Sequence, residues 1–160
     1  SWGTAGSGTL MTWWKFWERD STSGSPDYYE EGVALVGQEL YHEALTSFRL
    51  ALKSNPDDPA TLEQMAVVYT HIGLPDDAER AYTRAIELRP RSPSAHYGLA
   101  FLQMKNGRRF EAEGHLRAFL EYARPDRVDD RQIAHARRTL ERLGSGGDIR
   151  TGSRPSGDVV

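Results

Sequence analysis

The sequence has no cysteine, and this absence removes one group of functions at the outset. Without thiols the chain has no disulfide framework, no thiolate metal site and no cysteine nucleophile. Long apolar runs are missing too. The most apolar stretch near the start, residues 10–17, is far shorter than the roughly 20 residues that a membrane-spanning helix needs. It also lacks the basic flank and the small-residue cleavage site of a secretory signal.

Patterns that support catalysis or nucleic-acid binding are also lacking. The five histidines are scattered without ligand spacing, and no strand is predicted to precede a glycine-rich loop. The acidic pairs at 57–58 and 76–77 stand where helices are expected to begin. Because the net charge is −3, the arginines near the C-terminal end are better explained as a solvated helix face. We expect no enzyme activity, no metal or cofactor, and no nucleic-acid partner.

What the 160-residue chain does contain is a repeat of 34 residues. Each of three copies places an alanine at one position and a large apolar residue four positions later. These residues are Ala44, Ala78, Ala112, Phe48, Tyr82 and Leu116. Two helices can approach closely at the alanine and fill space at the larger side chain. A fixed period of this length is typical of a helical solenoid.

Signals for the start and the end of helices accompany the repeat. A capping side chain precedes a proline, which the first turn of a helix tolerates, at Ser25-Pro26, Asp58-Pro59 and Ser92-Pro93. Glycines expected to end the first helix of each pair are Gly37, Gly73 and Gly107. We therefore predict three helix pairs, over 25–58, 59–92 and 93–126.

The pattern after the third pair predicts one more helix over 127–143, beginning at Asp129 or Asp130. A solenoid needs such a capping helix because the last repeat has an apolar flank that no neighbour covers. Gly144 is expected to end it, and the composition of 144–160 indicates a disordered tail. Residues 1–24 are expected to be a flexible leader that contains a short amphipathic helix over 10–19.

The three copies resemble tetratricopeptide repeats (TPR). The second copy carries the signature most completely, at Leu62, Met65, Ala66, Tyr69, Gly73, Ala78, Tyr82, Ala85 and Pro90. The third departs from it at Gln103 and Phe119, so we expect its interface with the capping helix to pack differently. The resemblance implies an all-α, right-handed helical solenoid of three TPR helix hairpins with a C-terminal capping helix. It also implies binding of other proteins rather than catalysis.

In this family the first helix of each pair lines a concave groove. The corresponding stripe, with His71 at its rim, is the predicted partner-binding groove: Tyr29, Val33, Val36, Glu63, Val67, Thr70, His71, Tyr97, Phe101 and Met104. Glu63 is its only acidic or basic side chain apart from that histidine, so the stripe suits an amphipathic helix or an extended apolar segment of a partner. An alternative is that Val33, Val67 and Phe101 pack only against neighbouring helices.

Some family members clamp the carboxylate tails of heat-shock chaperones with lysine, asparagine and arginine. Tyr29, Val33, Ser94 and Gly98 stand at the corresponding positions here. We therefore expect a different class of ligand.

The segment before the repeats carries large apolar residues on one face of the predicted helix 10–19. These are Leu10, Trp13, Trp14 and Trp17, with Phe16 at the edge. An exposed patch of this size is uncommon on a monomer. Three destinations remain open for this predicted docking helix: its own solenoid, a membrane surface, or a partner protein.

Together these features predict a non-catalytic adaptor or assembly factor. It would hold a protein segment in its groove and dock to a membrane-associated complex through the tryptophan helix. The alternative is a structural subunit of a larger protein assembly, such as a membrane assembly, in which that helix is permanently buried against neighbours. The expected location is the cytoplasm or the periplasm, including the periphery of a membrane.

Overall fold

The computed structural model describes residues 27–148, and within this range it contains helices and no strand. The predicted all-α fold is therefore confirmed for this part of the chain. The leader, the tryptophan helix predicted over 10–19 and the tail beyond 148 lie outside the described residues. None of the described helices is both long enough and apolar enough to cross a membrane.

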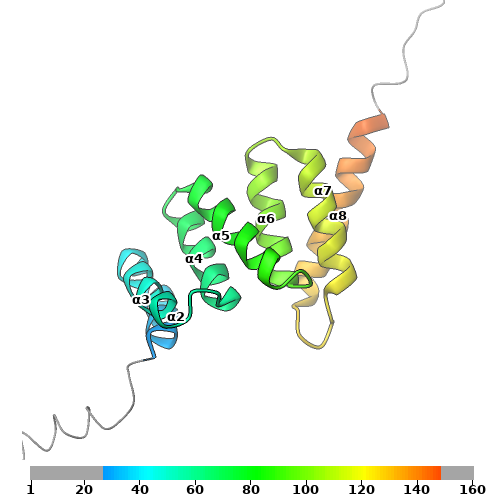
Figure 1. Cartoon of the computed structure of the whole chain (residues 1–160). Coiled ribbons are helices and arrows are strands. Elements are labelled where there is room, and N and C mark those ends of the chain that lie inside the picture. The colour runs from blue at the N-terminus through cyan, green and yellow to red at the C-terminus, as the bar shows by residue number, and fades with distance from the viewer. Residues whose placement is uncertain (1–26, 149–160) are drawn as a thin grey trace, which may run out of the picture.

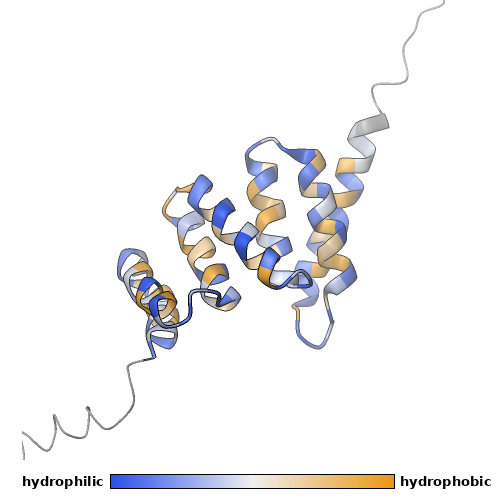
Figure 2. Ribbon diagram, viewed as in Figure 1, coloured by the Kyte–Doolittle hydropathy of each residue, from blue (hydrophilic) through white to orange (hydrophobic). Residues whose placement is uncertain are grey.

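Six of the helices form three hairpins, which stand in chain order along the solenoid (Figure 1). The hairpins are α2 (Tyr28–Gly37) with α3 (Tyr41–Ser54), α4 (Pro59–His71) with α5 (Pro75–Leu88), and α6 (Pro93–Lys105) with α7 (Arg109–Tyr122). The last helix, α8 (Asp130–Asp148), packs against α7 at the C-terminal end. Figure 2 shows hydrophobic and hydrophilic residues alternating along these helices, as expected when each helix buries only one side.

The caps of the first helices follow the predicted pattern in two of three copies. The side chain of Asp58 accepts a hydrogen bond from the backbone N–H of Thr61, with a proline in the first turn of α4. Ser92 accepts in the same way from Ala95 at the start of α6. In the first copy, however, the cap is Asp27 rather than Ser25, because α2 begins only at Tyr28.

The turn inside each hairpin has the same geometry in all three copies. Gly73 and Gly107 adopt positive φ angles of 77° and 79°. The equivalent residue of the first copy is Glu39, with φ 61°, and not the predicted Gly37, which is the last residue of α2. Glu39 therefore adopts a left-handed conformation. Glycine is favoured in this conformation, because the Cβ atom of any other residue crowds the backbone.

The buried core runs along the solenoid as three adjoining clusters centred on Phe48, Tyr82 and Leu116. The three alanines of the repeat are fully buried, as their close-approach position predicts. Packing is tight enough to require glycine as well, as at Gly32. A Cβ atom on Gly32 would lie 2.4 Å from the ring of Phe48.

The capping helix α8 begins as predicted, with the Asp129 side chain accepting a hydrogen bond from the backbone N–H of Arg131. Its predicted end at Leu143 is wrong, because the helix continues through Gly144 to Asp148. Glycine permits a left-handed turn but does not impose one, and Gly144 has no positive φ. The hydroxyl of Ser145 also donates to the carbonyl of Glu141, which is a typical contact within a continuing helix.

Candidate partner-binding groove

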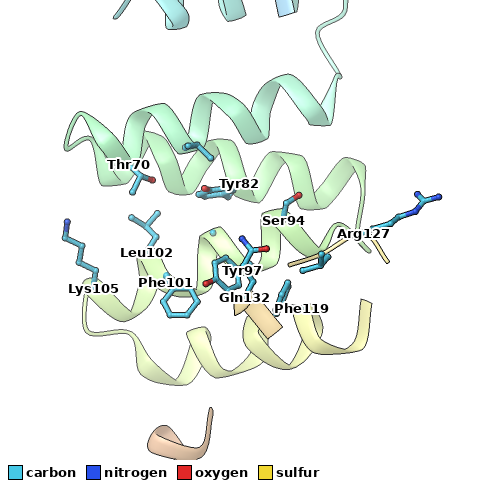
Figure 3. Close-up of a pocket in the computed structure, with 13 residues that line it drawn as sticks. Thr70, Tyr82, Ser94, Tyr97, Phe101, Leu102, Lys105, Phe119, Arg127 and Gln132 are labelled. Carbon is cyan, nitrogen blue, oxygen red and sulfur yellow. The ribbon is translucent and has the colours of Figure 1, made fainter. Parts of the chain in front are cut away.

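A cavity of about 540 Å³ lies between α4 and α6 and is bounded at one end by the segment that leads into α8 (Figure 3). Four of the ten predicted groove residues line it, namely Val67, Thr70, Tyr97 and Phe101. This volume lies within the range of protein pockets that bind ligands. We refer to this cavity as the α4–α6 groove.

The side chain of Tyr82 contributes to the lining of the groove from α5, the helix behind it. It can reach the groove because Gly98 on α6 has no side chain: a Cβ atom there would lie 2.3 Å from the ring of Tyr82. Tyr82 is 5% exposed, and burial raises the pKa of its phenol to about 12, with the charge of Glu63 adding to the shift. The phenol is therefore neutral near pH 7. The groove thus presents an uncharged aromatic ring behind α6.

Tyr97 and Phe101 line the groove and also contact the capping helix. The ring of Tyr97 lies 4.7 Å from that of Phe101 and 4.9 Å from that of Phe119, measured between centroids. His135 on α8 stacks on Phe101 at 4.7 Å, and its Nδ1 atom lies 3.0 Å from the Tyr97 hydroxyl. Both aromatic residues are therefore half-buried. Phe101 thus packs against a neighbouring helix, as the alternative interpretation of the sequence expects, and it also lines the groove.

Glu63 is buried rather than presented as a charge on the groove surface, which corrects the expectation from the sequence. It is only 9% exposed and accepts hydrogen bonds from the hydroxyls of Ser92 and Ser94, the first at 2.6 Å. These serines follow Glu63 by 29 and 31 residues, so the contact exists only once α6 packs beside α4. The carboxylate joins two adjacent repeats.

The other predicted groove residues do not line this cavity. Tyr29 and Val36 pack against the Phe48 cluster of the first repeat, and Val33 is 36% exposed. His71 stacks on Tyr41 of α3, with 4.9 Å between ring centroids. Met104 belongs to the cluster that α7 and α8 share. The structure therefore concentrates the groove at the second and third repeats.

Sequence reasoning missed several residues that do line the groove. These are Tyr82, Leu102, Lys105, Phe119, Arg127, Val128 and Gln132. Ser94 and Gly98, whose positions the family resemblance places on a groove-lining helix, line it as well. The glycine could have been noticed as an exception, because the first two repeats have the large residues Glu30 and Gln64 at the same position. Arg127, Val128 and Gln132 follow the repeats, so their approach depends on how the capping helix docks. The predicted docking helix, Leu10 to Trp17, lies outside the described residues.

A histidine pair between α6 and α7 was also not predicted. The Nδ1 atoms of His96 and His115 lie 2.9 Å apart, and Nε2 of His96 lies 2.8 Å from the Pro90 carbonyl oxygen. Because that carbonyl can only accept, Nε2 of a neutral His96 carries the proton and its Nδ1 accepts from His115. Burial lowers the pKa of His115, and the neighbouring His96 adds to this effect. No group of three metal-binding side chains occurs within 27–148.

Comparison with known sequences supports the assignment of the repeats. A family model described as Tetratricopeptide repeat matches residues 73–137. Photosystem I assembly protein Ycf3 of Prochlorococcus marinus (strain MIT 9211) is 34% identical over 90 residues, which is 54% of this chain and 52% of that protein. The protein of the same name from Synechococcus sp. (strain WH7803) has the same identity and coverage. The chain thus spans about half the length of the curated relatives it matches.

Two solved structures show the same fold. The Yersinia enterocolitica type III secretion chaperone SycD, in complex with a peptide of the translocator YopD, matches with a TM-score of 0.70 at 16% identity. The match covers 75% of this chain and 92% of SycD. The Sgt2 TPR domain from Aspergillus fumigatus matches with a TM-score of 0.66 at 21% identity, over 87% and 90% of the two chains. Residues 73–137 thus match the tetratricopeptide repeat family, and the predicted helical solenoid of TPR type is confirmed as the fold.

Proposed function

We propose that this chain is an assembly factor that holds an apolar segment of a partner protein in the α4–α6 groove. The observation that carries the proposal is the cavity of about 540 Å³ with Val67, Tyr97 and Phe101 on its walls and Tyr82 behind α6. Aromatic and aliphatic side chains around a concave site provide most of the binding energy in complexes of this kind.

The comparisons support a role of this class. The relatives from Prochlorococcus and Synechococcus are named as assembly proteins of photosystem I. SycD, which has the same fold, is described in complex with a peptide of its translocator. We carry over from these proteins only the kind of task, which is assembly for the two relatives and binding of a peptide for SycD.

A bulky substitution at Thr70 tests the groove with little risk to the fold. Thr70 is exposed at the groove, and its hydroxyl donates to the carbonyl four residues earlier, at Ala66. Thr46 on α3 is a matched control, because it is also exposed and its hydroxyl donates to His42 in the same way. We expect Thr70→Trp, but not Thr46→Trp, to abolish recovery of the partner in affinity capture from the organism that makes the chain. Equal recovery with both variants would exclude the groove as the binding site.

We further propose that the tryptophan helix predicted over 10–19 docks to a membrane-associated complex. Its support is the apolar stripe of Leu10, Trp13, Trp14 and Trp17, because tryptophan is favoured both at membrane interfaces and in protein contacts. Flotation with liposomes should be lost when residues 1–24 are removed. A full chain that never floats would exclude attachment to lipid and leave only docking to a protein.

A second candidate function is a structural subunit of a larger assembly, and one exposed side chain favours it. Phe110 at the start of α7 is 87% exposed, so its ring is available for contact with a neighbouring subunit. A permanent subunit should aggregate when it is purified alone, and Phe110→Ser should reduce that aggregation. An isolated chain that stays monodisperse favours the assembly factor instead.

A further inference from the structure

We propose that the segment held in the α4–α6 groove is a short apolar peptide with an acidic residue at each end. This inference rests on the proposed function and specifies the chemistry of the partner. It adds the charge of the partner to its apolar character, because the charged residues of 27–148 that line the cavity are all positively charged.

The two charged residues that line the groove are both cationic. Lys105 is at the end of α6, and Arg127 is in the segment before α8, so that they lie at opposite ends of the groove (Figure 3). Among residues 27–148, no aspartate or glutamate lines the cavity. Glu63, the only acidic member of the predicted stripe, is buried and accepts hydrogen bonds from Ser92 and Ser94 instead.

Both cations are available to a partner. Within the part of the chain that the structure describes, Arg127 has one acidic neighbour, Asp126, at 4.0 Å, and both side chains are more than half exposed. Contacts of that length between exposed groups contribute little free energy, so Arg127 can exchange Asp126 for a better placed carboxylate. For Lys105, no ion pair occurs with any residue in the described range 27–148.

The length of the groove sets the spacing of the two acidic residues. Ser94 marks the end of the groove at which Arg127 lies, because both residues also line a second, adjoining cavity. Ser94 and Lys105 lie eleven residues apart on α6, which corresponds to about 16 Å along the helix. An extended peptide covers this length in about five residues, at roughly 3.3 Å each. The middle of the peptide would face Tyr97, Phe101 and Val67, which exclude charged side chains.

Two cations at opposite ends also argue against a simpler ligand. A fatty acid or another monoanion with an apolar tail could satisfy only one of them. A peptide with two acidic ends pairs with both and buries its apolar middle, so charge complementarity selects this class of partner.

The test uses fluorescently labelled peptides with blocked ends and four leucines between two glutamates. Matched peptides replace both glutamates by glutamine or by lysine. Binding to the full chain is measured by fluorescence anisotropy at low and high salt. We expect the glutamate peptide to bind about tenfold more tightly than the glutamine peptide at low salt, since each exposed charge pair has a modest effect. The difference should shrink at high salt, because ions screen exposed charges.

Charge reversal identifies the residues responsible. Lys105→Glu and Arg127→Glu should each weaken binding of the glutamate peptide and strengthen binding of the lysine peptide. Lys53→Glu, the same change at an exposed residue on α3 outside the groove, should alter neither. Thr70→Trp should weaken the binding of every peptide that binds to the unmodified chain.

The outcomes separate this inference from the proposed function. If the three peptides bind equally and Thr70→Trp blocks all of them, the acidic ends are excluded and the groove remains the binding site. If no peptide binds, or if Thr70→Trp has no effect on binding, both the inference and the groove fail.

Discussion

The hydroxyl of Tyr97 lies 3.0 Å from Nδ1 of His135, and this hydrogen bond joins the groove helix α6 to the capping helix α8. One face of the α4–α6 groove is therefore supported by a helix outside the three repeats. Stability of the cap and integrity of the groove are coupled through this pair and through the stacking of His135 on Phe101.

Replacing Tyr97 by phenylalanine should weaken the cap and leave the aromatic packing in place. The ring keeps its contacts with Phe101 and Phe119, while the hydrogen bond is lost at a cost of about 1 kcal/mol. Urea denaturation measures the change in the free energy of unfolding. Tyr28→Phe is the control, because no hydrogen bond from the Tyr28 hydroxyl occurs within the described residues, and a loss of equal size there would contradict the role of His135.

Glycine in place of Glu39 should stabilise the first hairpin. Glu39 adopts the left-handed conformation that Gly73 and Gly107 adopt in the other two turns. Removing the strain of a side chain in this region should raise the free energy of unfolding by about 1 kcal/mol. Part of this gain is offset because glycine has a greater conformational entropy in the unfolded chain. The denaturation midpoint should rise for Glu39→Gly and fall for Gly73→Ala. A lower midpoint for Glu39→Gly would mean that the glutamate makes a stabilising contact of its own.

Ser92 should matter more for stability than its neighbour Ser94. Both hydroxyls donate to the buried carboxylate of Glu63, but only Ser92 also caps α6 by accepting from the N–H of Ala95. Ser92→Ala should cost about 1 to 3 kcal/mol, because it removes a cap and leaves a buried carboxylate with one partner fewer. Ser94→Ala should cost less. Equal losses in thermal unfolding would show that the cap contributes nothing.

Stability should fall as the pH drops below about 6.5, because of His115. Burial is the main cause that lowers its pKa below the ordinary value, His96 adds to it, and Glu79 opposes it. The unfolded chain therefore takes up a proton at a higher pH than the folded chain does. The stabilisation that a neutral His115 provides is complete above the unfolded pKa and is lost as the pH falls towards the folded one.

Urea denaturation between pH 7.5 and 5.5 measures this dependence. The measurement stays above pH 5 because the lowered pKa of Glu79, held down first by its hydrogen bond from Arg108, affects stability only in more acidic solution. The slope for one histidine is at most about 1.4 kcal/mol per pH unit. His115→Gln should flatten the curve, whereas the same change at the exposed His42 should not. A curve that keeps its slope in His115→Gln would assign the effect to another group.

The parts of the fold that depend on neighbours in sequence could be predicted, and the parts that depend on docking could not. Caps such as Asp58 and Ser92 act within one turn of a helix, and the buried alanines follow from the 34-residue period. The left-handed conformation of Glu39 was not predicted, because Gly37 is a nearby residue of the type expected there. Counting 34 residues back from Gly73 identifies the correct position.

The same distinction applies to the groove. Val67, Thr70, Tyr97 and Phe101 could be placed there from the stripe of the first helices. The half-burial of the two aromatic residues depends on α8, whose His135 is 38 residues from Tyr97 in sequence. Periodicity within a repeat cannot specify the position of a helix that follows the repeats.

The most direct test of the central claim is photocrosslinking from within the groove. A photoreactive benzoylphenylalanine at position 70, compared with the same residue at position 46, would be irradiated in cells that make the full chain, and the crosslinked peptides would be identified by mass spectrometry. We predict that position 70 captures one apolar segment of one partner and that position 46 does not. Crosslinks of equal yield at both positions, or none from position 70 while the partner still co-purifies, would contradict the groove as the binding site.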